Sequence, residues 1–158
     1  MDRVIIRAML SSDYDKIYAL WKTIEGFGIR SIDDSREGID KFIKRNPNTS
    51  VVAVMDGEIV GSVLCGHDGR TGYLYHVCVK KELRRHGIGR DMVVRAMTML
   101  KEEGINKVSL IAFVSNEGGN EFWRQVGWKG RSDVNFYDFV LNEENITSFN
   151  LQNRGGKQ

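Results

Sequence analysis

The segment from Val77 to Arg90 constrains the fold most strongly, because an apolar run passes through a short glycine-containing turn directly into a helix-forming sequence. The run YLYHVCV at 73–79 is rich in β-branched and aromatic residues, which favour a strand. From Gly89 onward, apolar residues recur with the helical period, and Gly104 is well placed to end the helix. The sequence therefore predicts a central strand followed at once by an amphipathic helix.

The turn between this strand and this helix has the composition of an anion site. A helix N-terminus presents unpaired backbone N–H groups and about half a positive charge. Gly87 and Gly89 lack the side chains that would hold a phosphate away from those groups, and Arg84, Arg85 and Arg90 add positive charge. The chain has neither the P-loop pattern nor the Rossmann glycine pattern with its acidic residue. We therefore predict a phosphate site of another type.

The rest of the chain alternates between strand-like and helical patterns that are typical of an α+β domain. Asp56-Gly57 joins two apolar runs as a hairpin, since both central turn positions need positive φ. Strands are expected at 3–8, 50–55, 59–66, 73–79, 108–114 and 134–141, and helices at 11–24, around 39–43, at 89–100 and at 120–126. We predict a single domain over residues 1–142 and a polar C-terminal tail over 143–158.

Composition narrows the classes of function. The net charge of +2 gives no reason to expect a nucleic-acid binder or a polybasic membrane protein. No run approaches about 18 apolar residues. Cys65 and Cys78 lie in apolar runs without ligand spacing, which predicts buried free thiols. His67 and Asp68 lack a third ligand nearby, so we predict no metal site. From the net charge and the short apolar runs, we predict a cytoplasmic protein that binds neither nucleic acid nor membrane.

A second block, SNEGGNEFWRQVGW at 115–128, follows the strand expected at 108–114. This block and the Arg-x-x-Gly-x-Gly turn between strand and helix together resemble the acetyl-CoA motifs of the GNAT acetyltransferase superfamily. The positions that match the family pattern in the second block are Asn116, Gly119, Phe122, Trp123, Gly127 and Trp128. Both blocks occur in order at the right separation, and the resemblance covers residues 3–141.

This resemblance implies the GNAT fold: a central mixed, mostly antiparallel twisted sheet that is splayed between its fourth and fifth strands, with helices on both faces. It also implies acetyl-CoA as co-substrate, with the pyrophosphate on the glycine turn and the pantetheine arm in the gap between the splayed strands. The residues expected to hold it are Val77, Cys78, Val79, Arg84, Arg85, His86, Gly87, Ile88, Gly89, Arg90, Asn116, Asn120 and Trp123.

The resemblance further implies an N-acetyltransferase that moves the acetyl group to a primary amine by direct attack in a ternary complex. The acceptor would be a peptide or protein N-terminus or a small-molecule amine. Tyr73 and Tyr75 match positions where some relatives relay a proton through water, and Glu25 lies in the loop that shapes the acceptor site in relatives. The alternative for Tyr75 is an aromatic strand residue that packs on a helix. Strand alternation puts His76 on the opposite face, so we expect a core or surface histidine there.

One position departs from the family pattern. Relatives usually carry a tyrosine in the second block as the general acid toward the leaving thiolate, and this sequence has Trp123 there. Indole cannot deliver that proton, so another group donates it or none is needed. A thiol with a pKa near about 8.5 leaves as thiolate at a cost of about 1–2 kcal/mol near neutral pH, so loss of the tyrosine would slow the step without preventing it. Because the tyrosine is missing while both cofactor blocks remain, the alternative function is a catalytically silent acyl-CoA-binding or sensing domain. Homodimers are common in the family, but the sequence shows no interface signature.

Overall fold

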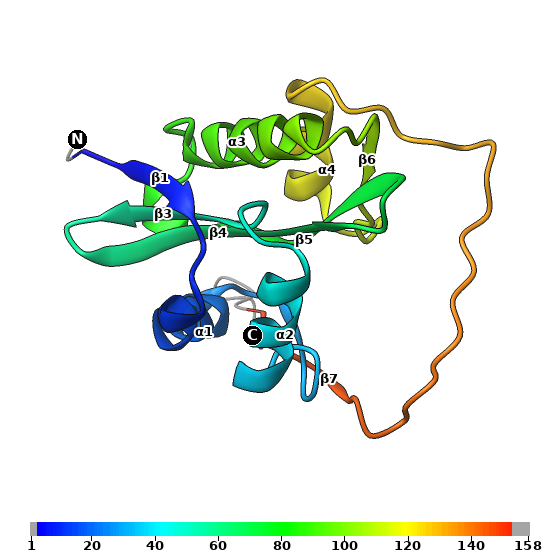
Figure 1. Cartoon of the computed structure of the whole chain (residues 1–158), viewed down its shortest axis with the longest axis horizontal. Helices are drawn as coiled ribbons and strands as arrows, with labels where there is room; N and C mark the ends of the chain where they lie inside the picture. Colours follow the sequence, from blue (N-terminus) through cyan, green and yellow to red (C-terminus); the bar gives the residue numbers. More distant parts are fainter. Residues whose placement is uncertain (1–2, 153–158) are drawn as a thin grey trace, which may run out of the picture.

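The computed structural model describes residues 3–152, which form a sheet with helices on both faces (Figure 1). The strands are β1 Ile5–Ala8, β2 Gly28–Arg30, β3 Val51–Met55, β4 Glu58–His67, β5 Thr71–Val79, β6 Lys107–Ser109 and β7 Thr147–Phe149. The helices are α1 Tyr14–Thr23, α2 Arg36–Arg45, α3 Ile88–Glu102 and α4 Glu117–Gln125, and short 3₁₀ turns cover Ser11–Asp13 and Lys81–Leu83. None of the helices in the described part of the chain is long and apolar enough to cross a membrane.

The main sheet has the strand order β1-β3-β4-β5-β6, and every neighbouring pair is antiparallel except the parallel pair β5–β6. Helices α1 and α2 cover one face, and α3 and α4 cover the other (Figure 1). The hairpin between β3 and β4 turns at Asp56 and Gly57, which both have positive φ. The predicted α+β fold, with a mostly antiparallel sheet between two helical layers, is confirmed.

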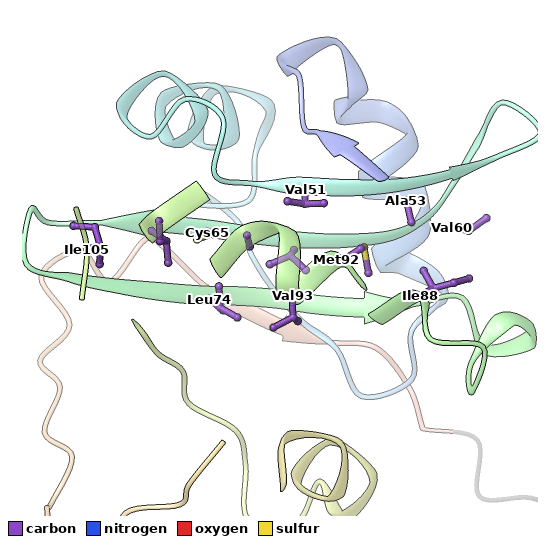
Figure 2. Close-up of a cluster of buried hydrophobic side chains, with 12 residues drawn as sticks. Val51, Ala53, Val60, Cys65, Leu74, Ile88, Met92, Val93 and Ile105 are labelled. Atoms are coloured by element: carbon purple, nitrogen blue, oxygen red, sulfur yellow. The ribbon is translucent and has the colours of Figure 1, made fainter. Parts of the chain in front are cut away.

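An apolar cluster lies on each face of the sheet. Met92 and Val93 of α3 pack toward strand residues such as Val51 on one face (Figure 2). On the other face, the Trp21 side chain of α1 is fully buried, and its indole N–H donates to Ser62 Oγ of β4 at 2.9 Å. Because helices pack on both faces of the sheet, the central strands β4 and β5 are held in place and can position the residues of a site.

Two predicted strands differ from the structure. β6 covers only three residues, 107–109, of the region predicted to be a strand at 108–114. The predicted strand at 134–141 pairs with no strand among residues 3–152, so that prediction is wrong for the single chain. The segment has the sequence of a strand, but a strand needs a neighbour, and residues 129–144 run away from the sheet as an open arc (Figure 1).

Part of the segment predicted to be a polar C-terminal tail pairs with the body of the molecule. β7 forms an antiparallel ladder with β2, in which Phe149 lies opposite Gly28. Next to it, the Asn150 side-chain amide donates to the carbonyls of Trp21 at 2.7 Å and Ile24 at 2.8 Å. Residues 147–150 therefore hold the loop that follows α1.

Candidate active site

The turn between β5 and α3 is braced by two of its own side chains. Arg84 Nε donates to the Val79 carbonyl at 3.1 Å, and His86 Nδ1 donates to the Leu83 carbonyl at 3.2 Å. These bonds tie the turn to the end of β5 without using the backbone N–H groups at the start of α3. Arg84 and His86 therefore shape the turn, while the neighbouring Arg85 is exposed.

The first turn of α3 has open N–H groups. The first intrahelical bond runs from Asp91 N to the Gly87 carbonyl at 3.0 Å, so the N–H groups of Ile88, Gly89 and Arg90 precede the helical ladder. Gly87 has φ of +83°, a left-handed conformation that disfavours side chains, and there is open space where a Cβ would stand. Ile88 is buried and anchors this first turn in the core, while Arg90 is exposed.

Gly89 allows a close approach between three elements. A Cβ at this position would lie 3.3 Å from the Phe122 ring of α4 and 3.5 Å from Val79 Cγ2 of β5. The Phe122 ring would have to shift by a few tenths of an ångström to admit a Cβ here, whereas the distance to Val79 is an ordinary van der Waals contact. The left-handed Gly87, the tight contact at Gly89 and the exposed arginines around them fit a bound pyrophosphate.

The sheet is splayed beside this turn. β5 and β6 pair only from Thr71 to Tyr73, although β5 continues to Val79. Among residues 3–152, no strand pairs with 74–79 on that edge. The open edge leads directly into the turn that precedes α3, so an extended group bound there would end at the helix N-terminus.

A β-bulge in β5 changes which side chains share a face. The register shifts between Ser62 and Leu64 of β4, and His76 has φ of 49°, so β5 contains one extra residue at this point. The prediction that His76 and Tyr75 face opposite ways is wrong, because the extra residue turns both side chains toward α1 and α2. Strand alternation alone cannot reveal such a bulge.

His76 is held by two aromatic rings and a buried carboxylate. Its ring centroid lies 4.7 Å from those of Trp21 and Phe27, and its Nε2 is 2.9 Å from Asp34 Oδ2. Asp34 is only 4% exposed and also accepts a bond from the Arg30 backbone N–H at 2.7 Å. The pair docks the loop before α2 onto the bulge. Sequence reasoning missed it because Asp34 and His76 are 42 residues apart and no local pattern links them.

The three predicted catalytic residues form two separate groups. The rings of Tyr73 and Tyr75 stack with centroids 5.5 Å apart, and Tyr75 meets the Phe42 ring of α2 edge-on. Burial, and then the neighbouring Tyr73, raise the pKa of Tyr75, so its hydroxyl keeps its proton at neutral pH. Glu25 Oε1 instead lies 3.6 Å from Lys81 Nζ, near the turn that follows β5.

The two asparagines of the second block connect α4 to the chain before it. Asn116 is the N-cap of α4, and its Oδ1 accepts a bond from Gly119 N at 3.0 Å. Asn120 Nδ2 donates to the carbonyls of Phe113 at 2.9 Å and Asn116 at 2.8 Å. Both predicted cofactor-binding amides therefore make hydrogen bonds within residues 113–120, where they stabilise the start of α4.

Comparison with known proteins identifies the family. The family model described as Acetyltransferase (GNAT) family matches residues 14–128, which is most of the chain. The chain belongs to the GNAT acetyltransferase family. An acetyltransferase of Pectobacterium atrosepticum is 30% identical to it over 112 residues, which cover 71% of this chain and 78% of the relative.

Solved structures of GNAT proteins share the fold. Aminoglycoside N-acetyltransferase AAC(6')-Iy in complex with CoA has a TM-score of 0.66 at 14% identity, covering 88% of this chain and 96% of the neighbour. A chain of the NatC complex bound to Gag peptide and CoA has a TM-score of 0.67 at 18% identity, covering 80% and 84%. At these identities the likeness shows the GNAT fold.

Trp123, which the sequence resemblance matched to the usual tyrosine of the family, lies in an aromatic cluster. Its ring centroid is 4.9 Å from that of Phe122 and 4.9 Å from that of Trp128. The carbonyl of Trp123 also accepts a bond from Trp128 N at 2.9 Å. Trp123 is therefore held between an aromatic neighbour on α4 and another in the segment that follows it.

Both cysteine thiols are buried in the sheet. Burial raises the pKa of the Cys78 thiol to about 11 and that of Cys65 to about 12, so both stay protonated and poorly nucleophilic near neutral pH. No cluster of three or more His, Cys, Asp or Glu side chains suited to a metal occurs in residues 3–152.

Proposed function

We propose that this chain is an N-acetyltransferase that moves an acetyl group from acetyl-CoA to a primary amine by direct attack in a ternary complex. The observation that carries the proposal is the start of α3, where open N–H groups, a left-handed glycine and exposed arginines adjoin the open edge of β5. Membership of the GNAT family supports acetyl transfer, and the structural neighbour AAC(6')-Iy was solved in complex with CoA.

The pyrophosphate would bind to the N–H groups of Ile88, Gly89 and Arg90, with Arg85 adding charge. The pantetheine arm would lie along the open edge of β5 as an added strand, and bond the backbone of Val77, Cys78 and Val79. Gly87 would leave room for the phosphates, and Arg84 and His86 hold the turn in shape. Asn116 and Asn120 stabilise the start of α4, and Trp123 on that helix would pack against the pantetheine.

Acetyl-CoA supplies an activated acetyl group, and the chain would orient that group toward the amine. A backbone N–H on the open edge of β5 would bond the acetyl carbonyl and stabilise the charge that develops on its oxygen. The amine would approach from the face of α1 and α2, where the bulge presents Tyr75 beside the docked His76. Trp123, which packs against the apolar cluster on the α3 side of the sheet, would contact the pantetheine and the acetyl group from that side.

The pKa of the amine determines which acceptors can react, because the amine must lose a proton before it attacks. An α-amino group with a pKa near about 8 costs less than about 1.5 kcal/mol to deprotonate at pH 7, whereas a lysine amine costs about 4–5 kcal/mol. The stacked side chains of Tyr73 and Tyr75 would relay that proton through water. Glu25 is a second candidate base, and it forms an exposed ion pair with Lys81. The lower cost of deprotonation favours a peptide N-terminus or a small amine of low pKa as acceptor.

The test is thiol release from acetyl-CoA across an amine panel at pH 7, with the products identified by mass spectrometry. The panel contains peptides with free N-termini, N-terminally blocked lysine peptides, aminoglycosides and polyamines. We expect acetylated product with at least one α-amine or amino sugar, at a rate at least about tenfold above blocked lysine peptides. Tyr75→Phe should lower that rate about 10- to 100-fold, whereas Tyr18→Phe, a matched change on α1, should not.

A catalytically silent acyl-CoA-binding domain is the second candidate, because Trp123 stands where relatives carry an acid. Acetyl-CoA binding without acetylated product from any amine would establish that function and reject the enzyme. If the rate is unchanged in Tyr75→Phe, the chain is still an enzyme but Tyr75 has no role in its reaction.

A further inference from the structure

Strand β7 and its neighbours hold the loop that joins α1 to α2. β7 lies on the same side of the sheet as these two helices (Figure 1). At one end of its ladder with β2, Asn150 N donates to the Phe27 carbonyl at 2.9 Å, and at the other end Ser31 N donates to the Ile146 carbonyl at 2.9 Å. The C-terminal part of the chain therefore belongs to the face from which, in the proposed function, the amine approaches.

The Phe149 ring of β7 lies between the two sides of the splayed sheet. It packs against the backbone of Gly28 in β2, where a Cβ would stand only 2.9 Å from the ring. Next to Gly28, the Phe27 ring contacts His76 of β5 at a centroid distance of 4.7 Å. On its other side, the Phe149 ring centroid is 6.0 Å from that of Phe113, in the segment that follows β6. We call Phe113 and Phe149 the aromatic pair.

The aromatic pair is open to an incoming molecule. The side chains of Phe113 and Phe149 are 66% and 56% exposed. An open depression of about 410 Å³ adjoins Phe149 between residues 22–25 and 149–151. Ligand sites are lined mainly by apolar and aromatic side chains, and aromatic rings contribute large contact areas to them. The aromatic pair therefore offers a surface on which an apolar group can pack.

The acidic side chains of the loop between α1 and α2 already have cationic or hydrogen-bonding neighbours. Glu25 lies 3.6 Å from Lys81, and Asp33 lies 3.6 Å from Arg30. The third, Asp34, is buried. An amine with several positive charges, such as an aminoglycoside, would gain little electrostatic attraction from these groups. The charges of the loop thus give a polycation no advantage over an amine with a single charge.

We propose that Phe149, together with Phe113, selects acceptors whose amine stands next to a large apolar group, such as the α-amine of a peptide that begins with phenylalanine or leucine. The apolar group packs on the aromatic pair while the amine reaches the acetyl group at the open edge of β5. Phe149 lies outside residues 14–128, which match the family model, so the family match does not supply this contact. The inference rests on the proposed function and names the class of amine.

The test compares peptides that differ only in their first residue, which is phenylalanine, leucine or alanine, and includes an aminoglycoside. The ratio of kcat/KM between the phenylalanine and alanine peptides reports the apolar contact. We expect a ratio of at least about 10 in the wild type and below about 3 in Phe149→Ala, through a higher KM for the phenylalanine peptide. The alanine peptide should keep its kcat/KM, and calorimetry should show unchanged acetyl-CoA affinity, each within about twofold.

Two further variants make the result specific to the ring. Phe136→Ala is the matched control, because it removes a phenylalanine of similar exposure, 63%, that lies outside the ladder of β2 and β7. It should keep the ratio of the wild type. Gly28→Ala leaves the Phe149 side chain intact but displaces its ring, since the new Cβ would overlap it. This variant should lower the ratio as Phe149→Ala does.

The outcomes separate this inference from the proposed function. A wild-type ratio near one, or an unchanged ratio in Phe149→Ala or in Gly28→Ala, overturns the inference while the enzyme remains. A kcat/KM for the aminoglycoside above that for the phenylalanine peptide does the same. If the wild type acetylates none of these amines, the proposed function fails, and the inference fails with it.

Discussion

Replacing Gly87 with glutamine is expected to weaken acetyl-CoA binding about 100-fold. The new side chain would project into the open space beside the N–H groups of α3 and displace the pyrophosphate. Two charge-assisted hydrogen bonds lost at about 1.5 kcal/mol each correspond to a factor of this size. Isothermal titration calorimetry with acetyl-CoA measures the effect.

Gly57→Gln is the matched control for this change. Gly57 in the β3–β4 hairpin has φ of +77°, close to the +83° of Gly87, and it also faces open space. Both variants should therefore lose a similar stability of about 1–2 kcal/mol from the left-handed backbone. Only Gly87→Gln should lose affinity. Equal losses of affinity in the two variants would attribute the effect to instability rather than to the site.

Trp21→Ala is expected to lower the free energy of unfolding by about 3–5 kcal/mol, the largest stability effect that we predict. The side chain is fully buried, packs against Phe27 and His76, and donates its N–H to Ser62 Oγ. Ser62 Oγ in turn bonds the His76 carbonyl at 3.3 Å, so the loss should also loosen the β5 bulge. Guanidinium unfolding followed by circular dichroism gives the value.

Trp21→Phe separates the hydrogen bond from the buried volume. It keeps most of the apolar contact and leaves Ser62 without its indole donor, so we expect a loss of about 1–2 kcal/mol. A Trp21→Ala variant that unfolds at the denaturant concentration of the wild type would contradict the packing described for α1.

The features that the sequence predicted correctly are local ones. The hairpin at Asp56-Gly57, and the step from β5 through a glycine turn into α3, each depend on residues within a few positions of one another. Turn chemistry, the period of apolar residues and helix capping act over such distances. For this reason the glycine turn between β5 and α3, where we propose the phosphate site, could be located from the sequence.

The features that the sequence did not predict are made by contacts between distant segments. The β5 bulge arises where β4 and β5 change register, and the bond between His76 and Asp34 joins a strand to a loop far away in the chain. A period-two pattern assumes an uninterrupted strand, so it assigned His76 to the wrong face.

The segment 134–141 makes the same point for strands. Its residues have strand propensity, but propensity does not supply a neighbouring strand, and no strand among residues 3–152 pairs with this segment. In contrast, three residues of the polar segment after 142 do pair, because β2 offers them an edge. Strand formation here is decided by available partners more than by sequence pattern.

The measurement that tests the account most directly is mapping of backbone amide shifts by NMR during titration with acetyl-CoA and with desulfo-CoA. The account predicts that both ligands shift the amides of Gly87, Gly89 and Arg90 most strongly, followed by those of Val77 and Val79 on the open edge of β5. Shifts that centre instead on the depression between 22–25 and 149–151, or no shifts at millimolar ligand, would contradict the proposed acetyl-CoA site.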